Sequence, residues 1–199
     1  MNIFIYKVST YDQDGNLTRQ TDELGNAVRY VRDARGRVIA AVLPDGGVFT
    51  TAYDGGGRVV ADTDALGNMT RYEHDLLGRV TKITDAESGE TDLVYDPAGN
   101  LVSVADALDM ETRHEFDNLG RLTKIVENYV DGVYNPSFTD EDVTTEFGYD
   151  ADGNLVSAAD PLGNTTTYEY DEIGRVTRIT SADPDGLGDL TSLVVLYLY

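Results

Sequence analysis

The stretch YDPAGNL at residues 95–101 contains the motif that decides the fold, because the same pattern returns throughout the chain. The pattern is Asp-x-x-Gly, followed by Asn or Arg and then by Leu or Val. An aromatic residue precedes the Asp in most copies, and Arg32 and His74 are the exceptions. The interval between copies is 21 residues, except for one interval of 33 residues. Such a fixed period predicts a repeat architecture. The eight copies begin at Asp12, Asp33, Asp54, Asp75, Asp96, Asp117, Asp150 and Asp171.

A second, looser turn motif lies about half a period after the first. Its members begin with Asp and mostly have Gly at the fourth position; they occupy residues 22–25, 64–67, 106–109, 160–163 and 183–186, with degenerate copies at 44–46 and 87–89. The repeating unit is therefore turn, strand, turn, strand.

The residue types in the motif follow from the chemistry of a tight turn. An Asp at the first position accepts a hydrogen bond from a backbone N–H two residues later. A Gly at the fourth position allows positive φ after a type I turn, which gives a hairpin loop with a bulge. In one copy Asp109 replaces this Gly, and Asp is among the few residues that tolerate the conformation.

The segments between the turns have the pattern of strands. Side chains alternate along a strand, so the positions one, three and five before a repeat Asp share one face. Before Asp171 these positions hold Tyr170, Tyr168 and Thr166. Aromatic and β-branched residues on one face are typical of a half-buried strand. The sequence therefore predicts an all-β array of short antiparallel β-hairpins, in which each unit contacts mainly its neighbours.

The strands that follow the first motif are less regular. In the segment Val80-Thr-Lys-Ile83 the apolar residues are three positions apart, which simple alternation does not produce. A β-bulge would explain this spacing, and so would a strand that contacts apolar surface on both sides. The sequence leaves both explanations open.

The charge of the chain narrows the classes of function. The 199 residues include 36 Asp and Glu against 15 Lys and Arg, which gives a net charge of −21. This balance argues against a nucleic-acid partner and against docking on an anionic membrane. Part of the charge is a by-product of the Asp-rich turns, which weakens any argument from acidity alone to a basic partner. There is no Cys, and therefore no disulfide and no thiolate metal site.

The termini show no targeting or membrane-spanning segment. The first residues lack the charge order and length of a secretory signal. The apolar run at residues 193–199 is too short to span a bilayer, so we expect no membrane span.

The repeat resembles the YD repeat of Rhs proteins, with related repeats in the shell components of insecticidal toxin complexes and in teneurins. The resemblance covers residues 10–186, nearly the whole chain. It implies a broad sheet wound in a curved spiral that forms the wall of a hollow shell. In bacterial members that shell encloses a C-terminal toxin, and in teneurins it belongs to an extracellular adhesion protein.

The chain also departs from the full pattern of this family. It is much shorter than a complete shell, and it has neither the closing core segment with its self-cleavage motif nor a toxin domain. Self-cleavage is therefore not expected, and the Asp-Pro pairs at residues 96–97, 160–161 and 183–184 are interpreted as turn chemistry. We predict a single array over residues 1–199, with an insertion at 127–142. The apolar end at 187–199 is either one more strand or a truncation point.

The predicted function is structural and non-catalytic: part of the wall of a shell that encloses or presents a toxin or mediates cell-surface interaction. The alternative is a carbohydrate-binding or adhesion module on the cell surface. The expected partners are neighbouring repeats of a longer chain or another copy, with an enclosed polypeptide or a cell-surface glycan as further candidates. The resemblance implies a secreted or cell-surface location.

Calcium is the one ion that the turns could hold. Closely spaced carboxylates occur at Asp12 and Asp14, at Asp150 and Asp152, and at the run from Asp183 through Asp185 to Asp189. Calcium takes six to eight oxygen ligands, and these stretches lack the spacing and the closing Glu of an EF-hand. Each stretch is also satisfied as a turn without metal, so no cofactor is expected.

Catalytic groupings do not stand out from the repeat. With 36 acidic residues, pairs of carboxylates at the separation of a glycosidase are unavoidable and not informative. His74 and His114 occupy strand positions where other copies have an aromatic residue, so we interpret them as packing substitutes rather than as metal ligands or bases. The sequence assigns no catalytic, metal-binding or ligand-binding residue.

The long interval between repeats contains 12 extra residues, at about Glu127–Asp142. Loops grafted on a repeat scaffold often mediate recognition, although a tolerated surface insertion is the simpler interpretation. The segment includes Tyr129, Tyr134, Asn135, Pro136 and Phe138. If it binds a partner, deletion of residues 130–140 is expected to abolish capture and leave the melting temperature unchanged.

Overall fold

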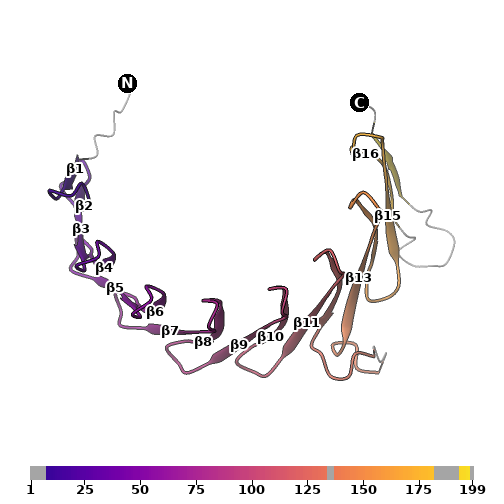
Figure 1. Ribbon diagram of the computed structural model, residues 1–199, viewed down its shortest axis with the longest axis horizontal. Helices are drawn as coiled ribbons and strands as arrows, with labels where there is room; N and C mark the ends of the chain where they lie inside the picture. Colours follow the sequence, from indigo (N-terminus) through magenta and orange to yellow (C-terminus); the bar gives the residue numbers. More distant parts are fainter. Residues whose placement is uncertain (1–7, 134–136, 182–192, 198–199) are drawn as a thin grey trace. The chain divides into compact units, whose positions relative to one another are not determined.

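The computed structural model describes residues 8–133, 137–181 and 193–197, and within them it contains seventeen β-strands and no helix (Figure 1). The all-β prediction is confirmed. The chain divides into two compact units, Met1–Thr91 and Asp92–Tyr199, and the boundary falls within strand β9 (Glu90–Tyr95).

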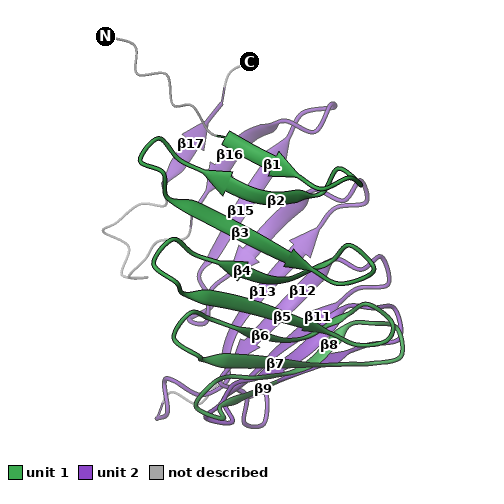
Figure 2. Cartoon of the chain, turned by 90° about the vertical axis from the view of Figure 1, so that its left-hand side faces the viewer, with its two compact units in different colours: residues 1–91 green, residues 92–199 purple. Residues whose placement is uncertain are grey.

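Unit 1 is a succession of antiparallel hairpins, in which each strand pairs with the next one along the chain. We call the turns of the 21-residue motif first-class turns and the looser turns between them second-class turns. Figure 2 shows the first-class turns of unit 1 at one end of the strands and the second-class turns at the other end. We refer to these two sides of the sheet, where the turns lie, as its edges. The strands are β1 (Val8–Tyr11), β2 (Leu17–Thr21), β3 (Ala27–Arg32), β4 (Val38–Val42), β5 (Val48–Tyr53), β6 (Val59–Thr63), β7 (Met69–His74) and β8 (Val80–Thr84).

Unit 2 repeats this arrangement from β9 onward, again with consecutive antiparallel pairing. The predicted hairpin array is therefore present in both units. The strands after β9 are β10 (Leu101–Ala105), β11 (Glu111–Phe116), β12 (Leu122–Glu127), β13 (Val143–Tyr149), β14 (Leu155–Ala159), β15 (Thr165–Tyr170), β16 (Val176–Thr180) and β17 (Val194–Leu196).

The two classes of turn have the same backbone geometry, although their sequences differ in regularity. In the first class, the N–H of Asp54 donates to the carbonyl of Arg58 at 2.9 Å, and Gly57 has a φ of 93°. In the second class, the N–H of Asp64 donates to the carbonyl of Asn68 at 2.9 Å. Both are type I turns followed by a residue with positive φ.

The degenerate turns keep this geometry with other residues. The turn at 43–47 begins at Leu43, one residue before the Pro-Asp-Gly motif. The other degenerate turn begins at Asp85. There Ser88 takes the position of the Gly and has a φ of 71°. Asp109 adopts a φ of 61°, as expected for the residue that replaces Gly there.

A β-bulge explains the apolar spacing of the second strand in each first-class hairpin. In β7–β8, Tyr72 pairs with Ile83 and His74 pairs with Val80, so the register shifts by one residue at Thr81. Val80 and Ile83 therefore lie on the same face, although they are three positions apart. Of the two explanations that the sequence left open, the bulge is the correct one, and the same shift occurs in all eight first-class hairpins.

The two faces of the sheet differ in chemistry. The tyrosine face, as we name it, holds the positions one, three and five before each first-class Asp, together with their partners on the following strand. The opposite face holds charged cross-strand pairs, such as Glu115 with Lys124 and Glu169 with Arg178. Among the described residues only Val126 and Asp142 are buried, and the other strand side chains are half-buried or exposed. Each unit is thus a single layer without the second layer that normally completes a core.

Side chains connect successive hairpins across this layer. The hydroxyl of Tyr53 donates to the carbonyl of Val38 at 3.1 Å, fifteen residues earlier, and Tyr170 donates to Leu155 at 2.8 Å in the same way. Where Arg32 replaces the Tyr, its guanidinium donates to the equivalent carbonyl, that of Leu17, at 3.2 Å. The aromatic residue of the motif therefore connects one hairpin to the previous one, and Arg can replace it because it also reaches this carbonyl.

The Arg at the end of the motif connects in the opposite direction. The guanidinium of Arg58 pairs with Asp54 in its own turn and also donates to the carbonyl of Asp75 in the next first-class turn, at 2.9 Å. Arg121 makes the same bond to the carbonyl of Asp150 at 3.0 Å. Several neighbouring hairpins are thus hydrogen-bonded to one another by side chains as well as by strand pairing.

The part of the chain that the structure describes contains no helix long and apolar enough to cross a membrane.

Candidate functional site at the inserted loop

The Asp at the first position of a turn accepts hydrogen bonds from the turn itself. In the first turn, the carboxylate of Asp12 accepts hydrogen bonds from the backbone N–H of Asp14 at 3.0 Å and of Asn16 at 2.8 Å, and from the side chain of Asn16. These donors lower the pKa of Asp12, with the side-chain amide of Asn16 as the largest cause. Asp150 is held in the same way by Asn154. The first-class turns thus stabilise the ionised carboxylate locally.

The acidic turns that the sequence offered to calcium lie partly in the described ranges. Within the described ranges, no group of three His, Asp or Glu side chains is placed to hold a metal ion. Asp183, Asp185 and Asp189 lie outside the described residues.

The two histidines lie on the tyrosine face, at the positions that the sequence assigned to them. His74 is paired with Val80 in unit 1, and His114 is paired with Ile125 in unit 2. The Nδ1 atom of His114 is buried and has no hydrogen-bond partner among the described residues.

The insertion is a folded loop between β12, which ends at Glu127, and β13, which begins at Val143. Its two ends are bonded together: the N–H of Asp142 donates to the carbonyl of Asn128 at 3.0 Å, and the side-chain amide of Asn128 donates to the carbonyl of Asp140 at 2.7 Å. Both Asn128 and Asp142 have positive φ. Tyr134, Asn135 and Pro136, which the sequence also placed in the insertion, lie outside the described residues.

A single carboxylate organises the first half of this loop. Asp142 is 2% exposed, and its Oδ1 accepts the backbone N–H groups of Val130 at 2.8 Å and of Gly132 at 2.9 Å. The N–H of Asp131 donates to the other oxygen at 3.2 Å. Burial alone would raise the pKa of Asp142, but these three N–H groups lower it further than burial raises it. The carboxylate is therefore ionised at neutral pH and holds the loop closed.

A cavity lies where this loop meets the strands, on the face opposite the tyrosine face. Its volume is about 640 Å³, and its lining includes Ser103, Glu111, Arg113, Lys124 and Tyr129. The guanidinium of Arg113 lies 3.5 Å from the centre of the Tyr129 ring and pairs with Glu111 at 2.8 Å. The hydroxyl of Ser103 donates to Glu111 at 2.7 Å. Arg113 and Ser103 together lower the pKa of Glu111, with Arg113 as the larger cause.

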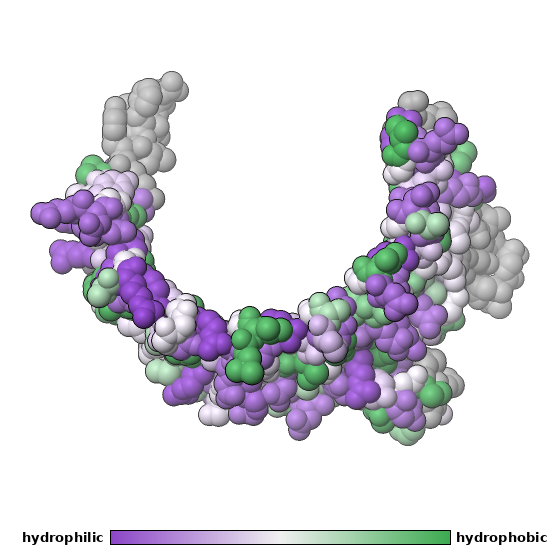
Figure 3. Space-filling model, in the orientation of Figure 1, coloured by the Kyte–Doolittle hydropathy of each residue, from purple (hydrophilic) through white to green (hydrophobic). Residues whose placement is uncertain are grey.

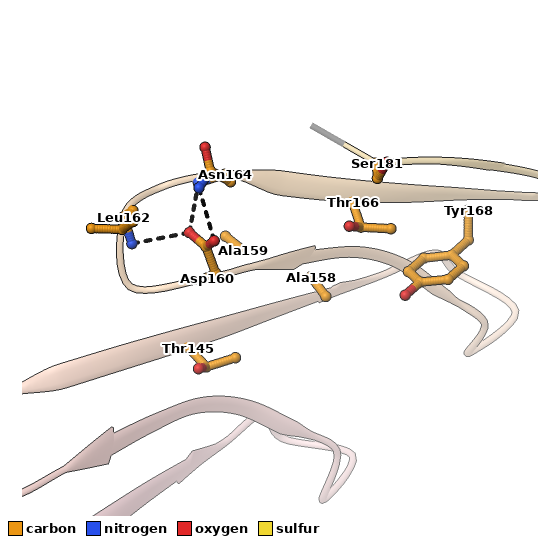
Figure 4. A pocket seen from close by; sticks show the side chains of 9 residues that line it. All are labelled: Thr145, Ala158, Ala159, Asp160, Leu162, Asn164, Thr166, Tyr168 and Ser181. Carbon is orange, nitrogen blue, oxygen red and sulfur yellow. Dashed lines mark hydrogen bonds between the residues drawn. The ribbon is translucent and has the colours of Figure 1, made fainter. Parts of the chain in front are cut away.

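A second hollow, of about 480 Å³, lies on the tyrosine face of unit 2 (Figure 4). Ala158, one of its lining residues, occupies the strand position that holds Ile125 in one other hairpin and Ile179 in another. Thr166 and Tyr168 also line it, and the turn that starts at Asp160 borders one end.

The sequence singled out the insertion and Tyr129, but it missed Asp142, Glu111 and Arg113. Asp142 looked like one more acidic residue, because its donors are ten to twelve residues away. Arg113 and Glu111 lie on a regular strand, and nothing in the repeat marks them. At the hollow, the sequence shows a small residue, Ala158, at a position that is Ile in three other copies, but Ala41 occupies the same position in another copy, so this signal is weak.

These features define a class of protein: a tandem array of β-hairpins built on Asp-Gly turns and connected by motif side chains. The sequence matches the RHS Repeat family over residues 11–48, 53–90, 95–129 and 149–186, which together make up most of the chain. The chain belongs to the RHS repeat family, as its motif indicated. Each match contains two copies of the Asp-x-x-Gly motif, and most of the insertion lies between the third and the fourth match.

The array is also similar to parts of solved structures. It superposes on a chain of the Photorhabdus luminescens Tc holotoxin pore with a TM-score of 0.62 and 18% identity, over 97% of this chain and 12% of the other. A crystal structure of TcdB2-TccC3 gives a TM-score of 0.65 and 17% identity, over 100% of this chain and 13% of the other. At this level of identity the similarity shows the fold, and the chain spans about one eighth of the chains that it matches. No curated protein matches the sequence.

Proposed function

We propose that this chain is a non-catalytic segment of the wall of an Rhs-type β-shell, and that the complete shell encloses a polypeptide. The single observation that carries the proposal is the one-layer sheet of repeated hairpins, in which only Val126 and Asp142 are buried among the described residues. A layer of this kind can be extended by adding hairpins, and each added hairpin finds the same partners.

The connections between hairpins support a wall rather than an enzyme. Strand pairing, the Tyr–carbonyl bonds and the Arg–carbonyl bonds all join a hairpin to the next one along the chain. In the first-class turns, carboxylates that could otherwise serve in catalysis accept hydrogen bonds from their own turn.

The cargo and the location are the finer part of the proposal. The solved structures that share this fold come from a holotoxin and from the TcdB2-TccC3 complex. By analogy, the enclosed polypeptide would be a toxin and the complete protein would be secreted. Acidity contributes little to this argument, because much of the charge comes from the turns.

Proteolysis of the natural gene product that contains this segment tests the proposal. We expect the complete protein to appear hollow by electron cryomicroscopy and to protect an internal polypeptide from a protease that digests the same polypeptide after denaturation. A solid particle, or digestion at the rate of the free polypeptide, would refute the enclosed cargo.

A second candidate function is recognition of a protein or a glycan by the inserted loop. The specific observation is that the exposed side chains of Val133 and Phe138 lie on the loop whose Tyr129 lines the 640 Å³ cavity. Deletion of residues 130–140 is a poor test, because it would leave the buried carboxylate of Asp142 without its three N–H donors. The double substitution Val133→Ser and Phe138→Ser keeps those bonds.

A glycan array and a pull-down with this double variant separate the two functions. If the loop recognises a partner, the variant loses capture and keeps the melting temperature of the parent. If the parent and the variant capture a partner equally, or if neither captures one, these side chains do not mediate recognition. Either outcome leaves the proposed wall function unchanged.

A further inference from the structure

The second-class turns present leucine side chains that nothing in the described structure covers. Leu24, Leu66, Leu108 and Leu162 occupy the third position of their turns and are 87, 88, 82 and 74% exposed. Figure 3 shows apolar patches separated by hydrophilic residues on the side of the molecule turned to the viewer. Isolated exposed leucines are ordinary, but a regular series is not.

The turn conformation does not require a leucine side chain at this position. The turn uses only the backbone of the residue: the N–H of Leu24 donates to Asp22, and the N–H of Leu66 donates to Asp64. The third position is polar in the intervening turns of unit 1: the N–H of Glu87 donates to Asp85 in the same way, and the carboxylate of Asp45 accepts the N–H of Gly47.

The leucines therefore recur at every second turn along this edge. Within one unit, two such turns are four strands apart, which corresponds to about 19 Å at the usual spacing between strands. The same two-hairpin period separates the four matches to the RHS repeat.

The opposite edge follows the same period. Leu77, Leu119 and Ile173 occupy the third position of three of the four alternate first-class turns and are also exposed, whereas the fourth, in unit 1, holds Arg35. In unit 2, for example, Leu108 and Leu162 lie at one edge, whereas Leu119 and Ile173 lie at the other.

We propose that these apolar turn tips are a lateral contact, through which one edge of a unit packs against the opposite edge of the same unit in a second copy of this chain. A second copy is the occupant that the spacing selects, because its unit 2 presents apolar tips at the same two-hairpin period on both edges, with Leu108 and Leu162 on one and Leu119 and Ile173 on the other. The contact is heterologous, since different edges meet, and it can add further copies side by side.

Charge sets the conditions under which the contact forms. Two copies with a net charge of −21 each repel one another, and acidic tips alternate with the leucines in unit 1. Salt screens this repulsion between exposed charges, whereas burial of leucine does not depend on it. Self-association is therefore expected to strengthen as the salt concentration rises, opposite to the behaviour of a contact held by ion pairs.

Sedimentation equilibrium of the complete chain tests the contact. The wild type is expected to exceed its monomer mass of 21.7 kDa, increasingly so at high protein and high salt. In the quadruple variant, all four leucines are replaced: Leu24→Asn, Leu66→Asn, Leu108→Asn and Leu162→Asn. Its association constant is expected to be lower than that of the wild type by a factor of at least about 100. Asn is favoured in turns, so the variant should fold, and far-UV circular dichroism confirms this.

The matched control changes the neighbouring position of two of the same turns, with Ala65→Asn and Ala107→Asn, and keeps every leucine. It should associate like the wild type. A wild type that stays monomeric at all salt concentrations, or a quadruple variant that associates as strongly as the wild type, would overturn the proposal. The contact extends the proposed wall function, but either result leaves the protease-protection test of that function unchanged.

Discussion

A regular turn and the inserted loop are both closed by an Asp carboxylate that accepts backbone N–H groups. The two differ in how far along the sequence the donors lie. In the regular turn, the carboxylate of Asp64 accepts the N–H groups of Leu66 and Asn68, two and four residues later, at 2.8 and 2.9 Å. In the insertion, the carboxylate of Asp142 accepts the N–H groups of Val130 and Gly132, twelve and ten residues earlier, at 2.8 and 2.9 Å. The regular turn is on the surface, whereas Asp142 is buried.

This difference shows what each region depends on. A regular turn closes with its own five residues, so it can form in any hairpin of the array. The insertion closes only when its two ends meet, so the stability of the loop depends on one carboxylate. Four predictions test this contrast.

The largest effect is expected from acid, because it acts on the regular turns together. The backbone N–H and guanidinium of Arg58 lower the pKa of Asp54 to about 2, from an ordinary value of 3.8. A carboxylate with a lowered pKa in the folded state stabilises the fold above its unfolded pKa, and this stability is lost as pH falls toward the folded value. We therefore expect the array to unfold between about pH 4 and pH 2.

A far-UV circular dichroism titration from pH 7 to pH 2 measures this transition. The variant Asp54→Asn should unfold at neutral pH with less urea than the wild type and should lose less stability on acidification. A spectrum that is unchanged down to pH 2 would show that the turn carboxylates do not control folding.

Asp142→Ala is expected to have the largest effect of any single substitution. It removes a carboxylate that is only 2% exposed and takes the shared acceptor from three partly buried N–H bonds, and loss of such an acceptor is costly. We expect the melting temperature to fall by about 5–10 °C and hydrogen exchange to accelerate at residues 130–132. Asp64→Ala is the matched control in a regular turn, where water can replace the lost acceptor, and its effect should be smaller. Equal losses in the two variants would show that burial of Asp142 adds nothing.

The same contrast explains how much could be predicted from the sequence. The hairpins could be predicted because the residues that close each turn, such as Asp64 and Asn68, are adjacent in sequence. The bulge at Thr81 remained one of two explanations, since it depends on pairing with the neighbouring strand. The role of Asp142 and the pairing of Arg113 with Tyr129 could not be predicted, because both depend on how a long loop returns to the sheet.

The bonds between hairpins allow a comparison across the insertion. The hydroxyl of Tyr149 reaches the carbonyl of Leu122 at 2.9 Å across 27 residues, whereas Tyr170 reaches Leu155 across the usual 15. If the insertion leaves the sheet undisturbed, Tyr149→Phe and Tyr170→Phe should each cost about 1 kcal/mol in urea unfolding. A clearly smaller loss for Tyr149→Phe would mean that the insertion loosens the hairpins on either side.

A reverse substitution provides the control for this pair. Phe116 occupies the position of the Tyr in the repeat and lacks a hydroxyl. Phe116→Tyr supplies a donor fifteen residues after Leu101, so a gain of up to about 1 kcal/mol is expected. A loss of stability would show that this site has no room for the hydroxyl.

The smallest effects are expected when Asp109 and Asn128, two residues with positive φ, are replaced by Gly. Asp109, in a regular turn, has a φ of 61°, and Asp109→Gly should raise the free energy of unfolding by about 0.5 kcal/mol because Gly adopts this conformation without strain. Asn128, in the insertion, has a φ of 48°, but its side-chain amide also donates to the carbonyl of Asp140 at 2.7 Å. Asn128→Gly relieves the same strain and loses that bond, so no gain is expected. Urea unfolding of the two variants side by side measures the difference, and equal gains would mean that the Asn128 bond does not stabilise the insertion.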